Sequence, residues 1–144
     1  MIKRTTTRLA LTLLAALALW PAAALARTPA ETVDAFYDAL RAADADALRA
    51  VLADDATVRL ADLGFDMTAE EFVDSMDVWS DVMADATMRV RPDAEATPER
   101  GTVVRIVCYE FPSNTSLTRE TSRVEGDRIA LNEQVEIGES CEGF

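Results

Sequence analysis

The sequence predicts one α+β domain in which three N-terminal helices pack on a curved, mainly antiparallel sheet. Residues 28–83 contain two capping-box sequences that can start helices, and their apolar residues recur at helical spacing,. From residue 86 onward the apolar residues alternate with a period of two, which is typical of strands joined by short turns,. Residues 27–144 are enough for one domain with one core,.

The first helix is expected to begin at Thr28. Thr28 and Glu31 have the spacing of a capping box, in which each side chain accepts a hydrogen bond from the other residue's amide,. Pro29 takes the first helical position, where its missing N–H is harmless. One apolar stripe follows at helical spacing and consists of Val33, Phe36, Tyr37 and Leu40,.

A second helix and a short strand follow a break at residues 43–46. Either Asp44 or Asp46 can cap this helix, which ends near Asp54 and Asp55,. Residues 57–60 then have the β-branched, alternating character of a strand,. Residues 62–66 are expected to form a loop.

The third helix is expected to run from Thr68, which forms a second capping box with Glu71, to about Met83,. Its stripe contains Phe72, Met76, Trp79 and Met83,. Such a stripe indicates a packed core, or a pocket wall, because Met and Trp adapt well to small apolar ligands.

Four strands are expected at residues 86–91, 102–111, 115–124 and 128–137,. The second of these is apolar on both faces, whereas the helices can cover only one. This predicts either a homodimer through the open sheet face or a sheet that curls over itself. In the last strand one face is expected to carry Ile129, Leu131, Glu133, Val135 and Ile137.

Three features of the first half resemble the N-terminal part of nuclear-transport-factor-2-like domains. They are the aromatic pair Phe36-Tyr37, the helix cap DADAL (residues 44–48) and the segment LADDATV (residues 52–58) leading into a strand. The resemblance implies a cone-shaped fold that hosts both SnoaL-like cyclases and isomerases and plain binding modules.

The residues that a ketosteroid isomerase of this fold requires are replaced here. The resemblance places Leu60 where the carboxylate base is expected and Phe36 near the expected tyrosine,. Tyr37 is one residue away, which turns its side chain by about 100° on a helix. The resemblance therefore implies the fold, whereas these two replacements count against isomerase chemistry.

Composition excludes several kinds of catalysis. The chain has no histidine, which excludes Ser-His-Asp and Cys-His sites and the usual zinc sites,. It also removes the His–acid pair on which many SnoaL-like cyclases rely. No metal site and no cofactor are expected.

Glu133 is the candidate acid of the sequence. On an apolar face, burial would favour its protonated form, as a general acid or base requires. The alternatives are an ion pair with an arginine, such as Arg105 or Arg119, or a bulge that turns the side chain outward. The candidate ligand-binding residues are Phe36, Tyr37, Met76, Trp79, Tyr109 and Glu133.

Residues 1–26 have the three parts of a secretory signal peptide. Lys3, Arg4 and Arg8 precede the apolar run 9–20, and Ala24-Leu25-Ala26 forms a cleavage site,. The net charge of −12 argues against binding to nucleic acid or to anionic membranes,. Cys108 and Cys141, the only cysteines, are expected to form a disulfide in an exported protein,.

These observations predict a secreted or periplasmic protein that has no membrane contact after cleavage of the leader. Its expected function is non-catalytic binding, either of a small apolar or amphipathic molecule in the cone or of a protein partner. The alternative is a SnoaL-like enzyme of isomerase, cyclase or hydrolase type that uses carboxylates alone.

Overall fold

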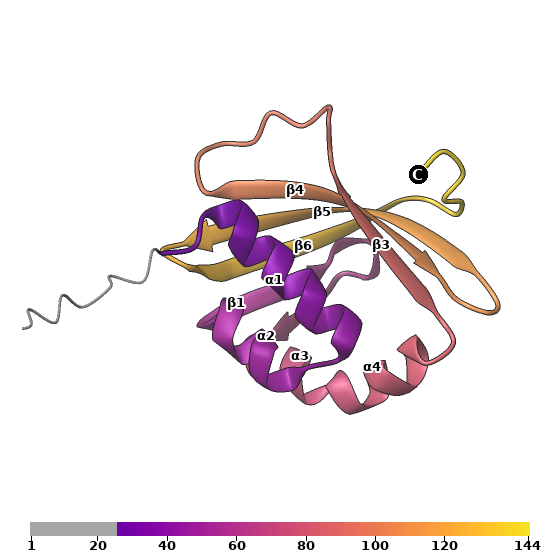
Figure 1. Ribbon diagram of the computed structural model, residues 1–144, viewed down its shortest axis with the longest axis horizontal. Helices are drawn as coiled ribbons and strands as arrows, with labels where there is room; N and C mark the ends of the chain where they lie inside the picture. The colour runs from indigo at the N-terminus through magenta and orange to yellow at the C-terminus, as the bar shows by residue number, and fades with distance from the viewer. Residues whose placement is uncertain (1–25) are drawn as a thin grey trace, which may run out of the picture.

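The computed structural model describes residues 26–144, so the predicted signal peptide lies outside the described residues except for Ala26. Helices and one six-stranded curved sheet form the domain, which confirms the predicted fold class (Figure 1). The helices are α1 (Pro29–Ala42), α2 (Ala45–Val51), α3 (Ala69–Asp74) and α4 (Met76–Met83), with a 3-10 turn η1 (Ala61–Leu63). The strands are β1 (Leu52–Leu60), β2 (Phe65–Thr68), β3 (Thr87–Pro92), β4 (Thr102–Glu110), β5 (Thr115–Glu125) and β6 (Arg128–Gly138).

The sheet has the strand order β2-β1-β6-β5-β4-β3. Neighbouring strands are antiparallel except for β1 and β6, which run parallel. Helix α1 lies across the sheet, and α2, α3 and α4 extend along one side of it (Figure 1).

The helix starts follow the predicted capping boxes. Thr28 and Glu31 exchange hydrogen bonds at the start of α1, and Thr68 and Glu71 do the same at the start of α3. The predicted third helix is wrong in one respect, because it divides at Ser75 into α3 and α4. The Ser75 hydroxyl donates to the carbonyl of Phe72 at 2.6 Å, and such local bonds compete with regular helix geometry,.

A short edge strand occupies part of the segment expected to be a loop. Residues 65–68 pair antiparallel with the end of β1, from Leu60↔Phe65 to Thr57↔Thr68. Gly64 has φ 61°, the left-handed conformation that ends the 3-10 turn η1 and lets the chain reverse,. β2 is the edge strand on this side of the sheet, and the turn η1 connects it to β1.

A β-bulge changes which residues of β6 face the helices. Val124 pairs with Ile129 but Arg123 pairs with Leu131, so Ala130 is an extra residue between them,. Ile129 and Asn132 are therefore both buried under the helices, and the prediction that Ile129 shares a face with Leu131 and Glu133 is wrong. The inserted residue reverses the alternation of side chains beyond it.

Aromatic side chains from α1 and α3 form the centre of the core. Phe36 lies edge-on to Tyr37, with ring centroids 5.3 Å apart, and stacks on Phe72 at 6.0 Å. All three are buried, together with Leu48, Val58 and Ile129. Burial of each such side chain contributes about 1.5–3 kcal/mol relative to leaving it exposed.

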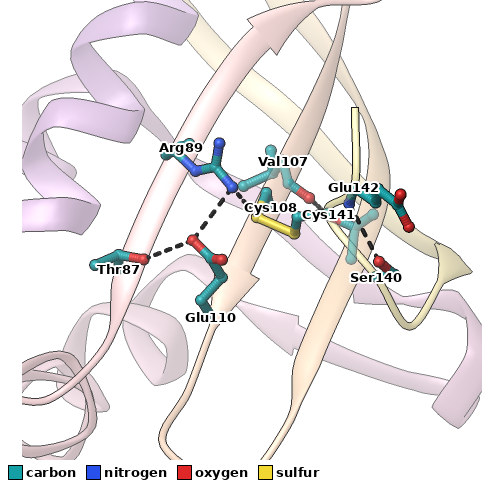
Figure 2. The surroundings of a disulfide bond; sticks show 9 residues. Thr87, Arg89, Val107, Cys108, Glu110, Ser140, Cys141 and Glu142 are labelled. Carbon is teal, nitrogen blue, oxygen red and sulfur yellow. Dashed lines mark hydrogen bonds and ion pairs between the residues drawn. A yellow bond between two sulfur atoms is a disulfide. The ribbon is translucent and has the colours of Figure 1, made fainter. Parts of the chain in front are cut away.

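The predicted disulfide is confirmed and fixes the C-terminal tail against β4. Cys108 and Cys141 are bonded, with Cα atoms 5.8 Å apart (Figure 2). Arg89, on the neighbouring strand, contacts the sulfur of Cys108 and pairs with Glu110 beside it. The ring of Phe144 lies against the guanidinium groups of both Arg89 and Arg91,.

This tail bears on the predicted homodimer. Ile106 and Cys108 point away from the helices, yet both are buried within the single described chain. The outer face of β4 is thus less open than the sequence implied, because Cys141 and the tail lie against it. Dimerisation through the rest of this face stays a prediction.

Reduction of the disulfide should lower the melting temperature strongly. The bond joins residues 33 apart, and closing such a loop contributes roughly 3–4 kcal/mol by restricting the unfolded chain. Thermal unfolding with and without reductant measures the effect. The matched control is Cys108→Ala/Cys141→Ala, which should melt near the reduced protein and not respond to reductant; equal melting of oxidised and reduced protein would refute this.

Candidate functional site

The most unusual group in the interior is the carboxylate of Glu120, on β5, which is completely buried. The Tyr37 hydroxyl donates to its Oε2 at 2.9 Å, and the Tyr109 hydroxyl donates to its Oε1 at 2.8 Å. The Thr118 hydroxyl also donates to Oε1, at 2.9 Å. Three hydroxyl groups therefore compensate the burial of one carboxyl group.

The cluster joins the helix layer to the centre of the sheet. Tyr37 lies on α1, Tyr109 on β4, and Thr118 and Glu120 on β5. Beside them, the Asn132 side chain donates to the Ser122 hydroxyl at 3.1 Å and accepts from Gln134. Within residues 26–144, every buried side-chain nitrogen or oxygen atom has a hydrogen-bond partner.

Burial also changes the protonation of the cluster. Loss of water around Glu120 raises the pKa of its carboxyl group, an effect that the donors Tyr109, Tyr37 and Thr118 oppose,. Burial and the adjacent carboxyl raise the pKa of Tyr37 and of Tyr109 well above the ordinary value. Both hydroxyls thus remain protonated donors at neutral pH.

A cavity of about 450 Å³ opens between α4, the 3-10 turn η1 and the sheet; Tyr109 and Thr118 line it, whereas Glu120 does not. Its lining is mostly apolar and aromatic. The lining residues are Leu40, Leu60, Asp62, Leu63, Met67, Phe72, Ser75, Met76, Trp79, Tyr109, Phe111, Ser116, Thr118, Gln134 and Glu136.

Three aromatic rings form one wall of the cavity. Tyr109 stacks on Phe111, with centroids 6.0 Å apart, and meets Trp79 edge-on at 6.1 Å. The Trp79 indole donates to the carbonyl of Leu40 at 2.8 Å, which fixes the ring. The wall is therefore held in place without a ligand.

Three of the six predicted ligand-binding residues line this cavity, namely Met76, Trp79 and Tyr109. Phe36 and Tyr37 lie behind it in the core, where Tyr37 contacts Glu120. Helix α1 turns Tyr37, and not Phe36, toward the carboxyl group, because successive residues of a helix point about 100° apart.

Glu133 lies on the opposite side of the sheet from the cavity. Its neighbours Asn132 and Gln134 point inward, and Glu133 alternates with them,. Its carboxylate pairs with Arg59 at 3.4 Å, and Arg59 also pairs with Asp66. Arg105 and Arg119, the partners considered from the sequence, pair instead with Asp34 and Asp93.

Sequence reasoning missed Glu120, although the pattern of β5 contains a signal. Arg119 and Arg123 mark one face of this strand as solvent-facing, so the alternate residues 118, 120 and 122 must point inward,. A carboxyl group among inward threonine and serine residues then needs hydrogen-bond donors. Tyr37 and Tyr109 supply them, but their approach depends on the tertiary fold.

Among the described residues, no group of three or more His, Cys, Asp or Glu side chains could hold a metal ion. In the same part of the chain, no helix is both long and apolar enough to cross a bilayer.

Solved structures share this architecture. IdmH from Streptomyces antibioticus, a candidate polyketide cyclase, has a TM-score of 0.62 and 18% identity, covering 76% of this chain and 92% of IdmH. An NTF2-like protein from Burkholderia xenovorans has a TM-score of 0.60, 16% identity and coverage of 78% and 86%. An epoxide hydrolase from M. tuberculosis has a TM-score of 0.55, 16% identity and coverage of 76% and 82%.

No family model matches the chain, and no curated protein matches it. The structural likeness shows that the chain has the nuclear-transport-factor-2-like fold, as its N-terminal features predicted. This fold occurs in proteins named as cyclases and hydrolases, so it does not decide between binding and catalysis,.

Replacing Glu120 with glutamine should change how stability depends on pH. The pKa of the Glu120 carboxyl group is raised from 4.5 in the folded protein. Its contribution to the free energy of unfolding is therefore complete at pH values below the pKa in the unfolded chain, and it is lost as the pH rises through the pKa in the folded protein. In Glu120→Gln the side chain at this position cannot titrate. The variant should therefore gain stability relative to the wild type as pH rises, by at most about 1.4 kcal/mol per pH unit.

Urea unfolding at a series of pH values from 4 to 8 measures this difference. Glu70→Gln, which removes an exposed carboxyl group on α3, controls for the loss of one charge. A difference between Glu120→Gln and wild type that stays constant, or changes in the opposite direction, would contradict the raised pKa.

Proposed function

We propose that the protein binds a small, largely apolar or amphipathic molecule in the cavity next to α4. The observation that carries this proposal is an apolar cavity of about 450 Å³ with a rigid aromatic wall. Its volume is within the usual range of small-molecule sites, about 300–1,000 Å³. Leu63, which also lines the cavity, is 76% exposed, so a ligand that reaches the opening would bury additional apolar surface there,.

The positions of the polar groups favour binding over catalysis. Glu120 is not among the residues that line the cavity, and its two oxygens already accept three hydrogen bonds. A general base must reach the proton that it removes. Leu60, at the position where the resemblance implies a base, contributes only an apolar surface to the cavity.

A second candidate, an enzyme that uses carboxylates alone, is favoured by one observation. Asp62 and Glu136 are both among the residues that line the cavity, and paired carboxylates can act as acid and base. Mass spectrometry of a bound molecule after prolonged incubation separates the two functions. Recovery of the unchanged molecule agrees with binding, and a changed product establishes catalysis.

We also propose export to a periplasmic or extracellular compartment. The Cys108–Cys141 disulfide supports this, because such bonds persist in oxidising compartments,. The three-part leader at residues 1–26 supports it independently,. Intact-mass analysis of protein from its native host should show a chain that begins at Arg27, and a full-length mass would contradict cleavage.

The neutral probe N-phenyl-1-naphthylamine, which becomes fluorescent in apolar surroundings, tests the binding site. We expect saturable binding to the wild type and at least a tenfold weaker affinity for Met67→Trp, because the larger ring fills part of the cavity. The matched control is Val78→Trp, since Val78 lies on α4, is 69% exposed and does not line the cavity. Absence of saturable binding, or equal weakening by both substitutions, would refute the proposed function.

A further inference from the structure

The rim of the cavity carries two carboxylates that have no cationic partner. Asp62 belongs to the 3-10 turn η1 and Glu136 to β6, and both are exposed at the opening. The backbone N–H of Glu136 donates to the carboxylate of Asp62, which holds the two residues together. Within residues 26–144, neither carboxylate lies in an ion pair, whereas most arginines of the chain do.

The carboxylate of Glu136 is also oriented. The Ser116 hydroxyl, another cavity-lining group, donates to its Oε2 at 3.0 Å. One side of the opening therefore presents two fixed negative charges, and they lie next to the apolar interior of the cavity.

No positive charge balances these carboxylates at the cavity. None of the lining residues in the described chain is arginine or lysine. The chain as a whole has a net charge of −12. Both the local and the overall field therefore attract cations and repel anions.

The aromatic wall adds a second attraction for a positive charge. Trp79, Tyr109 and Phe111 form a contiguous set of rings along the same cavity. The faces of aromatic rings attract ammonium groups, most strongly where water is excluded. The buried residues Leu40, Phe72 and Met76 form the deeper, apolar part.

We propose that the cavity selects molecules that carry a positive charge, such as a substituted ammonium group, on an apolar body. The apolar body lies against Leu40, Phe72 and Met76, and the charged group lies between the aromatic wall and the carboxylates of Asp62 and Glu136. This inference rests on the proposed binding function and adds the charge of the ligand to it.

Three probes of similar shape and different charge test the inference. They are 4-phenylbutyltrimethylammonium, its neutral isostere with carbon in place of nitrogen, and 5-phenylpentanoate. Each is titrated against the N-phenyl-1-naphthylamine complex in low salt. We expect the cation to bind about tenfold more tightly than the neutral isostere, the anion to bind most weakly, and salt to reduce the preference.

Neutralising the rim should remove the preference for the cation. In Asp62→Asn/Glu136→Gln, each amide oxygen can still accept the hydrogen bond that the carboxylate accepts, so the fold is retained. The affinity ratio of cation to neutral isostere should fall about tenfold, with little change for the neutral isostere. The matched control is Asp55→Asn/Asp127→Asn, which removes two exposed carboxylates outside the cavity and should retain the ratio.

Two outcomes would overturn the inference. One is that the neutral isostere or the anion binds the wild type as tightly as the cation does. The other is that the rim variant and the control variant have the same affinity ratio. If N-phenyl-1-naphthylamine still binds, either result refutes the charge preference alone. If that neutral probe does not bind the wild type, the proposed function itself is refuted.

Discussion

The burial of one carboxyl group constrains the rest of this structure. Glu120 has no contact with solvent, so the fold must supply hydrogen-bond donors to both of its oxygens,. The donors come from α1, β4 and β5, through Tyr37, Tyr109 and Thr118. The position of helix α1 on the sheet is thus determined by a directional polar contact in addition to apolar packing. Loss of any donor would leave a buried oxygen or hydroxyl less satisfied, at a cost of about 1–3 kcal/mol.

The same cluster defines the chemistry of the neighbouring cavity. Tyr109 presents its ring to the cavity while its hydroxyl is bonded to Glu120 behind it. The interior carboxyl group is therefore committed to the fold, and the cavity keeps an apolar floor and an aromatic wall. Its charged groups, Asp62 and Glu136, are confined to the rim. This division is the basis of the proposed binding of an amphipathic molecule.

The sequence predicted those features that depend on short-range patterns. Both capping boxes and the Cys108–Cys141 bond follow from residue type, spacing and compartment,. The face of β6 could not be predicted, because the bulge at Ala130 arises from pairing with β5 and leaves no mark in the local alternation,. Alternation without the bulge places Glu133 on the same face as Ile129, and the inserted residue turns it to the other face,. The alternation within β5 did contain the position of Glu120, but its tyrosine partners lie 83 and 11 residues away in sequence.

The titration of Glu120 itself tests this account most directly. In protein labelled with 13C at glutamate, the Cδ resonance of Glu120 can be assigned by its absence from Glu120→Gln and followed against pH. The account predicts a midpoint above the ordinary carboxyl pKa of 4.5. It also predicts a further rise in Tyr109→Phe, because the lost hydroxyl donor stabilised the ionised form. A midpoint at or below 4.5, or one that does not respond to loss of the Tyr109 hydroxyl, would contradict it.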